Sequence, residues 1–117
     1  MKNLNLTVRD TIAVIEFDQP DSKVNVLNTE TMTEFAGVID DLMRRPQGEV
    51  RGLLITSKKK GIFIAGADIQ EIEHITSIDL AKEKADKGKE VLDRLAALDL
   101  VTISVINGAC LGGGLEL

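Results

Sequence analysis

The chain has 117 residues, enough for one domain or part of one, because domains usually run to about 100–150 residues. The net charge of −5 argues against nucleic acid as the main partner, and no run of about 18 apolar residues could span a membrane. The single cysteine, Cys110, excludes an internal disulfide, and the first residues lack the apolar core of a secretory signal. Composition therefore predicts a soluble intracellular protein.

Residues 1–22 predict a hairpin of two strands. From Leu4 to Val8 apolar and polar residues alternate, which is the period of a half-buried strand. The pair Asp10-Thr11 turns the chain into Ile12–Phe17, which is almost wholly apolar and predicts a buried strand. The turn formers at 18–22 end it.

A helix is predicted next, because apolar residues recur at intervals of three and four at Met32, Phe35, Val38, Ile39 and Leu42. Either Asn28 or Thr31 can cap its start, the latter with Glu34 three residues later as in a capping box. Pro46 and Gly48 end the helix.

The middle of the chain predicts a buried strand over Arg51–Ser57, parallel to its neighbours. A loop at 58–61 leads to the short apolar run Ile62–Ile64. A short helix is predicted around Ile69–His74. His74 has no cysteine or second histidine at ligand spacing, so we expect a surface helix residue and no metal site.

A longer helix is predicted from Ser77 to about Leu98, with Thr76 and Asp79 as its capping signal. Small and apolar residues form a narrow seam along it: Ala81, Ala85, Gly88, Leu92 and Leu95. Two oppositely charged pairs lie one turn apart on its polar face: Glu83 with Lys87, and Glu90 with Arg94. Val101 begins the last strand, and the alternation of strands and helices predicts an α/β fold without repeats or linkers.

Two segments share one design, a strand end followed by small residues and a helix start: Phe63–Ile69 and Ile106–Glu116. Either one alone is explained as a packing device. Together they predict two backbone N–H groups that converge on one oxygen, since glycine allows close approach and a helix start carries positive partial charge. Such donors stabilise an enolate or tetrahedral oxyanion by about 3–4 kcal/mol each. Glu116 supplies an acid–base group beside them.

Two other glycine-rich motifs are excluded. A P-loop requires Lys followed by Ser or Thr after its second glycine, but Gly114 and Leu115 follow Gly113. The dinucleotide fingerprint requires a glycine where Cys110 stands. Cys110 is expected to be a small packing residue rather than a nucleophile.

The segments Phe63–Ile69 and Asn107–Glu116, with Asn25-Val26-Leu27, resemble the signatures of the enoyl-CoA hydratase/isomerase (crotonase) superfamily. The second segment is most similar to the hydratase part of multifunctional fatty-acid oxidation enzymes, in which a 3-hydroxyacyl-CoA dehydrogenase follows. The resemblance covers essentially the whole chain. It implies a crotonase-type superhelix of strand-strand-helix units, with residues 1–117 forming the N-terminal half of the domain.

The resemblance also implies roles for individual residues. The backbone N–H groups of Ala67 and Gly113 would hold the thioester oxygen, and Glu116 would be one of two glutamates that activate a water. The second glutamate would lie beyond Leu117, so this piece alone is expected to be almost inactive. The adenine and pantetheine pocket would be lined largely by backbone at Val24, Ala65, Asp68 and Ile69. Asp68 could equally cap a helix, and the lysines at 58–60, or Lys23, could contact CoA phosphates or form a solvated turn.

The implied reaction is hydration of 2-trans-enoyl-CoA in β-oxidation. It needs no cofactor beyond the CoA thioester substrate, and NAD would serve only a downstream dehydrogenase. Implied partners are further copies in a trimer-based oligomer or a thiolase subunit, in the bacterial cytoplasm or the mitochondrial matrix. Enoyl-CoA isomerisation, another CoA-thioester reaction and a non-catalytic acyl-CoA-binding module remain as alternatives.

Overall fold

A computed structural model describes residues 2–66 and 77–110. The elements in chain order are β1 (Leu4–Arg9), β2 (Ile12–Phe17), α1 (Thr29–Arg44), β3 (Gly52–Ser57), β4 (Ile62–Ile64), α3 (Ile78–Ala96), β5 (Val101–Ser104) and β6 (Ala109–Cys110). Two strand-strand-helix units are followed by a third pair of strands. The expected α/β architecture is confirmed.

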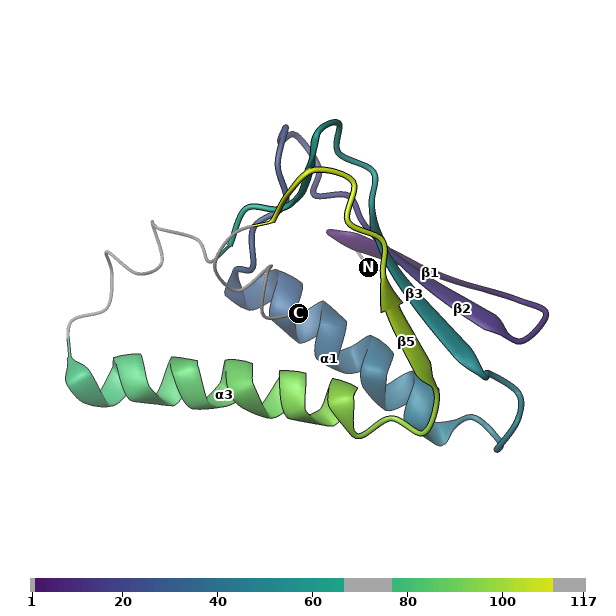
Figure 1. Cartoon of the computed structure of the whole chain (residues 1–117). Helices are drawn as coiled ribbons and strands as arrows, with labels where there is room; N and C mark the ends of the chain where they lie inside the picture. The colour runs from purple at the N-terminus through teal and green to yellow at the C-terminus, as the bar shows by residue number, and fades with distance from the viewer. Residues whose placement is uncertain (1, 67–76, 111–117) are drawn as a thin grey trace.

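The main sheet has four strands in the order β1-β2-β3-β5 (Figure 1). The predicted hairpin is present, since β1 and β2 pair antiparallel around a turn in which Asp10 has a φ of 57°. β3 lies parallel to both β2 and β5, as its apolar run predicted. The ends of β2 and β3 therefore lie at the same edge of the sheet.

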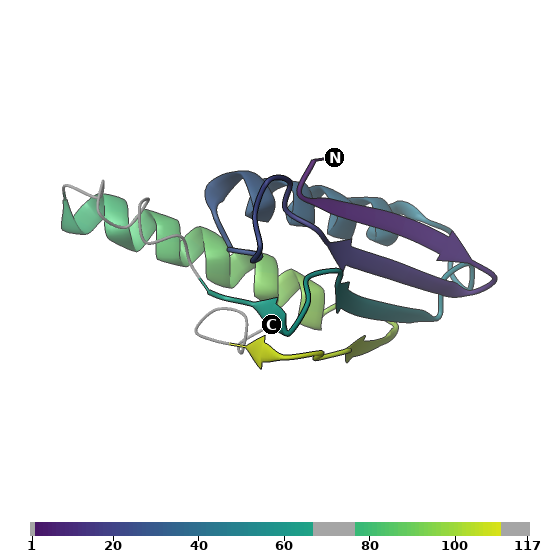
Figure 2. The same ribbon diagram turned by 90° about the horizontal axis from the view of Figure 1, so that it is seen from above.

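α1 lies against one face of this sheet (Figure 2), and its apolar stripe forms the core with β2 and β3. Phe35 of α1 packs against Phe17 with ring centroids 5.8 Å apart and planes at 55°. Of the two predicted caps, Asn28 is the one used, because its Oδ1 accepts a hydrogen bond from the Thr31 N–H at 2.7 Å. Thr31 is instead buried in the first turn.

α3 differs from the expectation in its cap and in one ion pair. Its cap is Ser77, whose Oγ accepts from the Leu80 N–H at 3.1 Å, while Thr76 lies outside the described residues. The predicted Glu83–Lys87 pair is present at 3.2 Å. Arg94, however, pairs with Asp40 of α1, because α1 packs beside this end of α3 and offers a carboxylate across the helix interface. In the predicted seam of α3, Leu95 is the buried residue.

A second sheet was not predicted. Ala109–Cys110 forms strand β6, which pairs parallel with β4, whereas the sequence analysis placed only a turn there before a helix. Two residues are too short for a periodic signal, and their partner strand lies far back in the sequence. The predicted short helix around Ile69–His74 lies outside the described residues.

Glu34 of α1 ties the N-terminal segment to the helix. Its carboxylate accepts from the backbone N–H of Lys2 at 2.5 Å and of Asn3 at 2.9 Å, and from the Asn3 side-chain amide. Burial acts to raise the pKa of Glu34, but these hydrogen bonds together outweigh it and hold the pKa below its usual value. The ionised form is therefore the one that stabilises the fold.

Replacing Glu34 by glutamine should lower the melting temperature at neutral pH. A lowered pKa contributes stability above the ordinary carboxyl pKa, and this contribution is lost as the pH falls through the folded-state pKa. The difference between wild type and Glu34→Gln should therefore disappear in acid, as followed by circular dichroism. Glu90→Gln, at an exposed site on α3, is the control and should show no such pH-dependent difference. If Glu34→Gln lowered the melting temperature by the same amount at every pH, the ionised carboxylate would not be the stabilising form.

Candidate active site

The two segments singled out in the sequence run side by side. β4 and β6 are parallel, with Ile62 opposite Ala109 and Ile64 opposite Cys110 (Figure 2). Because the two strands run in the same direction, the carboxyl ends of β4 and β6, at Ile64 and Cys110, lie at the same edge of this sheet. The predicted oxyanion donors, Ala67 and Gly113, and the predicted base, Glu116, lie outside the described residues.

The register of β4 and β6 is irregular in one place. It shifts between Ile62 and Ile64, so that Phe63 stands as an extra residue in β4. An extra residue of this kind lacks a ladder partner, which leaves its polar backbone groups open to other bonds. Its side chain is fully buried.

The Asn107-Gly108 turn before β6 is anchored to the loop after β3. The Asn107 side-chain amide donates to the Lys59 carbonyl at 2.8 Å. A Cβ built on Gly108 would lie only 2.1 Å from the carbonyl oxygen of Gly61, which itself has a φ of +71°. Position 108 therefore requires glycine for close backbone approach, and this approach places β6 beside β4.

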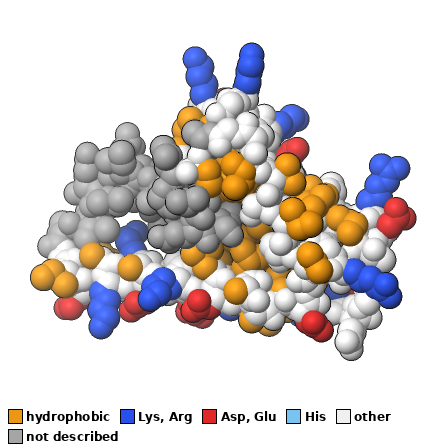
Figure 3. Space-filling view, in the orientation of Figure 1, with side chains coloured by type: hydrophobic (Ala, Val, Ile, Leu, Met, Phe, Trp, Pro, Cys, Tyr) orange, Lys and Arg blue, Asp and Glu red, His pale blue; other side chains and the backbone are white. Residues whose placement is uncertain are grey.

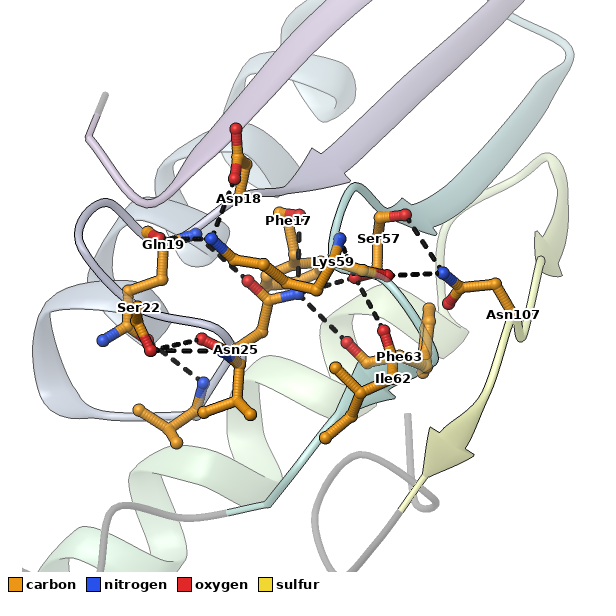
Figure 4. Close-up of polar contacts among 12 residues, drawn as sticks. Phe17, Asp18, Gln19, Ser22, Asn25, Ser57, Lys59, Ile62, Phe63 and Asn107 are labelled. Carbon is orange, nitrogen blue, oxygen red and sulfur yellow. Dashed lines mark hydrogen bonds and ion pairs between the residues drawn. The ribbon is translucent and has the colours of Figure 1, made fainter.

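Asn25 is the polar centre of the region (Figure 4). Its side chain is 1% exposed, and its Oδ1 accepts from the Gln19 N–H at 3.1 Å. Its Nδ2 donates to Ser57 Oγ at 2.8 Å and to the Phe63 carbonyl at 3.0 Å. The Ser57 hydroxyl in turn donates to the Ile62 carbonyl at 3.0 Å. Asn25 thus connects the loop after β2 with the end of β3 and with β4.

The backbone around Asn25 pairs with the chain that follows β4. The Ala65 N–H donates to the Asn25 carbonyl at 2.8 Å, and the Leu27 N–H donates to the Gly66 carbonyl at 2.7 Å. Gly66 is buried and has a φ of +113°, a conformation that L side chains rarely adopt. In the sequence Asn25-Val26-Leu27 stands out only as a position that matches the family, because Asn25 and its partners Ser57 and Phe63 are far apart along the chain.

Two of the predicted substrate-lining residues fall in the described part, Val24 and Ala65. Both are half-buried, and Ala65 bonds to the neighbour of Val24. The Val24 backbone is held in a tight turn, where Ser22 Oγ donates to the Val24 carbonyl at 2.9 Å and accepts from its N–H at 3.2 Å. The other two, Asp68 and Ile69, lie outside the described residues.

The predicted basic cluster borders an open hollow lined by Asp18, Lys23, Lys58, Lys59 and Lys60. Lys59 is engaged within the fold, since its Nζ lies 3.0 Å from Asp18 Oδ1 and donates to the Gln19 carbonyl at 2.5 Å. The other three lysines are exposed. Figure 3 shows basic side chains that project from the top of the molecule, where the loops after β2 and β3 lie.

Of the remaining singled-out residues, Cys110 agrees with its simpler explanation. Cys110 is half-buried and packs against the core, as expected of a small packing residue. Over residues 2–66 and 77–110 there is no group of His, Cys, Asp and Glu side chains that could hold a metal ion. No helix in these ranges is both long and apolar enough to cross a membrane. His74 lies outside them.

Residues 7–117 match the model of a protein family described as enoyl-CoA hydratase/isomerase. The chain belongs to this family. Among curated proteins, the fatty acid oxidation complex subunit alpha of Shewanella oneidensis is 38% identical over 117 residues. The same subunit of Shewanella halifaxensis is also 38% identical. The alignment covers 99% of this chain but 16% of each relative, so the chain spans a small part of their length.

Solved structures of the family superpose closely on the chain. An enoyl-CoA hydratase from Geobacillus kaustophilus matches with a TM-score of 0.89 and 28% identity, over 99% of this chain and 42% of that one. An enoyl-CoA hydratase/isomerase family protein from Hyphomonas neptunium matches with a TM-score of 0.85 and 30% identity, over 98% and 43%. The fold is therefore part of the crotonase fold that the motifs implied.

Proposed function

We propose that this chain provides the N-terminal part of a domain that hydrates 2-trans-enoyl-CoA to 3-hydroxyacyl-CoA. The observation that supports this most directly is the parallel pairing of β4 with β6. Ala67 and Gly113 each stand three positions after the paired residues Ile64 and Cys110. Equal displacement from paired positions of parallel strands is compatible with two donors that converge on one oxygen.

In the proposed mechanism the N–H groups of Ala67 and Gly113 hydrogen-bond the thioester oxygen. This draws electron density from the double bond and makes Cβ electrophilic, and the negative charge that develops on the oxygen is stabilised by both donors. Glu116 and a second carboxylate position the water and accept a proton from it as its oxygen bonds to Cβ. A carboxyl group of this pair then delivers a proton to Cα. The elements of one water are thereby added across the double bond.

Substrate binding would use the described surface beside β4. Val24 and Ala65 would contact the CoA moiety largely through backbone, with Asp68 and Ile69. The exposed lysines, Lys23, Lys58 and Lys60, offer positive charge to its phosphates. The loops that carry these lysines and the loop that carries Val24 lie at the same end of the sheet.

The names of the curated relatives support fatty-acid oxidation as the setting. We propose that the full-length protein is a β-oxidation enzyme of the bacterial cytoplasm or mitochondrial matrix, oligomeric on a trimeric plan or bound to a thiolase subunit. NAD would be needed only by a dehydrogenase domain of the kind found in multifunctional members.

The test is hydration of crotonyl-CoA by the full-length protein, followed as loss of the conjugated thioester absorbance. We expect catalysed loss of absorbance and formation of 3-hydroxybutyryl-CoA. Catalysed gain of absorbance from a 3-enoyl-CoA, without hydration, would instead assign isomerisation on the same site. Binding of CoA thioesters with neither reaction would contradict an enzymatic role and favour a binding module.

A further inference from the structure

The segment from Asn25 to Leu27 holds β4 and the two residues after it at three points, and we name this arrangement the Asn25 clamp. The Asn25 side-chain amide donates to the Phe63 carbonyl, the Asn25 carbonyl accepts from the Ala65 N–H, and the Leu27 N–H donates to the Gly66 carbonyl. These bonds measure 3.0, 2.8 and 2.7 Å. They hold backbone groups of Phe63, Ala65 and Gly66, the last of which directly precedes position 67.

The last of these bonds, from the Leu27 N–H to the Gly66 carbonyl, holds the peptide unit that carries the proposed oxyanion donor. The Gly66 carbonyl shares its peptide unit with the N–H of residue 67. In a planar trans peptide the C=O and the N–H point in opposite directions, so the partner of the carbonyl also determines where the N–H is aimed. A hydrogen bond to the carbonyl further polarises the unit and strengthens its N–H as a donor.

We propose that Asn25 is a positioning residue for the oxyanion donor at position 67, and that the Leu27 N–H is the group through which its loop aims that donor. The proposal rests on the proposed function, in which the Ala67 N–H contacts the thioester oxygen. Gly66 has a φ of +113°, which glycine adopts readily and an L side chain rarely does, so the orientation of this peptide unit depends on the bonds made to it.

The clamp is itself rigidly held. Asn25 accepts from the Gln19 N–H through Oδ1 and donates to Ser57 Oγ through Nδ2, and it is almost fully buried (Figure 4). A buried amide destabilises the fold if its donor or its acceptor is left unpaired. Both groups of Asn25 are paired here, so its side chain is held in one orientation. No other natural side chain of this size combines two N–H donors with a carbonyl acceptor, so substitutions at Asn25 should disturb the clamp.

The first experiment compares Asn25→Ala with Asn3→Ala in the full-length protein. Asn3 is also a buried asparagine, 4% exposed against 1%, but its side chain bonds to Glu34 of α1, away from β4. The readout is the carbonyl stretching frequency of bound butyryl-CoA, whose saturated acyl chain cannot add water. A well-aimed donor lowers this frequency relative to free thioester.

We expect Asn25→Ala to move the frequency back toward the free value and to lower kcat by about 10²-fold with little change in KM, as for a misplacement of about 1 Å. Asn3→Ala should destabilise the fold and leave the bound frequency at the wild-type value. A wild-type frequency in Asn25→Ala would show that Asn25 is only structural and would overturn the proposal.

The second experiment removes one bond and keeps every side chain. An amide-to-ester replacement at Leu27 deletes the N–H that donates to the Gly66 carbonyl, and it decides the proposal even if Asn25→Ala does not fold. The matched control is the same replacement at Arg51, whose N–H donates to the Thr11 carbonyl at an equal 2.7 Å, outside the clamp.

The Leu27 ester should raise the frequency and lower kcat, and the Arg51 ester should change neither. Equal behaviour of the two esters would overturn the proposal. If butyryl-CoA bound to wild type shows no lowered frequency at all, the proposed function fails, independently of the clamp. A lowered frequency in wild type that survives the Leu27 ester refutes the clamp alone.

Discussion

Replacing Glu116 by glutamine should lower the rate of crotonyl-CoA hydration by about 10²–10⁴-fold, the range that a positioned acid–base group contributes. Glutamine keeps the size of the side chain but cannot act as an acid or a base. The affinity for butyryl-CoA should stay close to that of wild type, because the proposed binding contacts are made by backbone groups and lysines. The measurements are steady-state kinetics and calorimetric titration.

Glu83→Gln is the matched control for this substitution. Glu83 lies on the polar face of α3, where it pairs with Lys87, and its loss should leave hydration unchanged. Unchanged turnover in Glu116→Gln would remove this glutamate from the mechanism. If Glu116→Gln lowered turnover and butyryl-CoA affinity by the same factor, Glu116 would be a binding residue rather than an acid–base group.

Replacing Gly108 by alanine should have the largest combined effect on stability and activity. The added Cβ would lie 2.1 Å from the Gly61 carbonyl oxygen and 2.6 Å from the Ile62 nitrogen, and both are backbone atoms that cannot rotate away. Overpacking of this kind costs about 1–3 kcal/mol or more, and relief of the clash has to move β6 away from β4. In the proposed mechanism that pairing aligns the two oxyanion segments, so we expect hydration to fall by about 10²-fold.

Gly88→Ala is the control, measured by the same denaturant unfolding and kinetics. A Cβ at Gly88 of α3 would meet nothing within 4 Å, so alanine there should stabilise the helix by about 0.5–1 kcal/mol and leave activity unchanged. Wild-type stability in Gly108→Ala would contradict the close approach. Reduced stability with wild-type activity would show that the β4–β6 pairing does not govern the site.

Local patterns in the sequence were sufficient for most of the elements. Alternation predicted β1, and helical spacing predicted α1 with Asn28 as one of two possible caps, because each depends on neighbours a few residues away. The apolar run of β3 predicted a buried parallel strand, and its pairing with β2 and β5 confirms it. The glycine motifs and Asn25-Val26-Leu27 pointed to the family that the comparison of residues 7–117 shows.

Contacts between distant segments could not be predicted from local patterns. β6 has only two residues and is a strand because it pairs with β4. Arg94 forms an ion pair with Asp40 rather than the predicted one with Glu90, because α1 lies beside α3. The bonds from Asn25 reach Ser57 and Phe63, more than thirty residues away.

The sequence by itself determined the first hairpin, the two long helices, β3 and β5, and which residues have the chemical capacity for the site, because periodicity, capping and residue type are local properties. Only the tertiary structure decided which distant segments meet. The register of β4 on β6, the glycine contact between 108 and 61, and the hydrogen bonds of Asn25 all join segments brought together by the collapse of the core. Their geometry is a property of the packed chain, in which each buried polar group must find a partner that is distant in sequence.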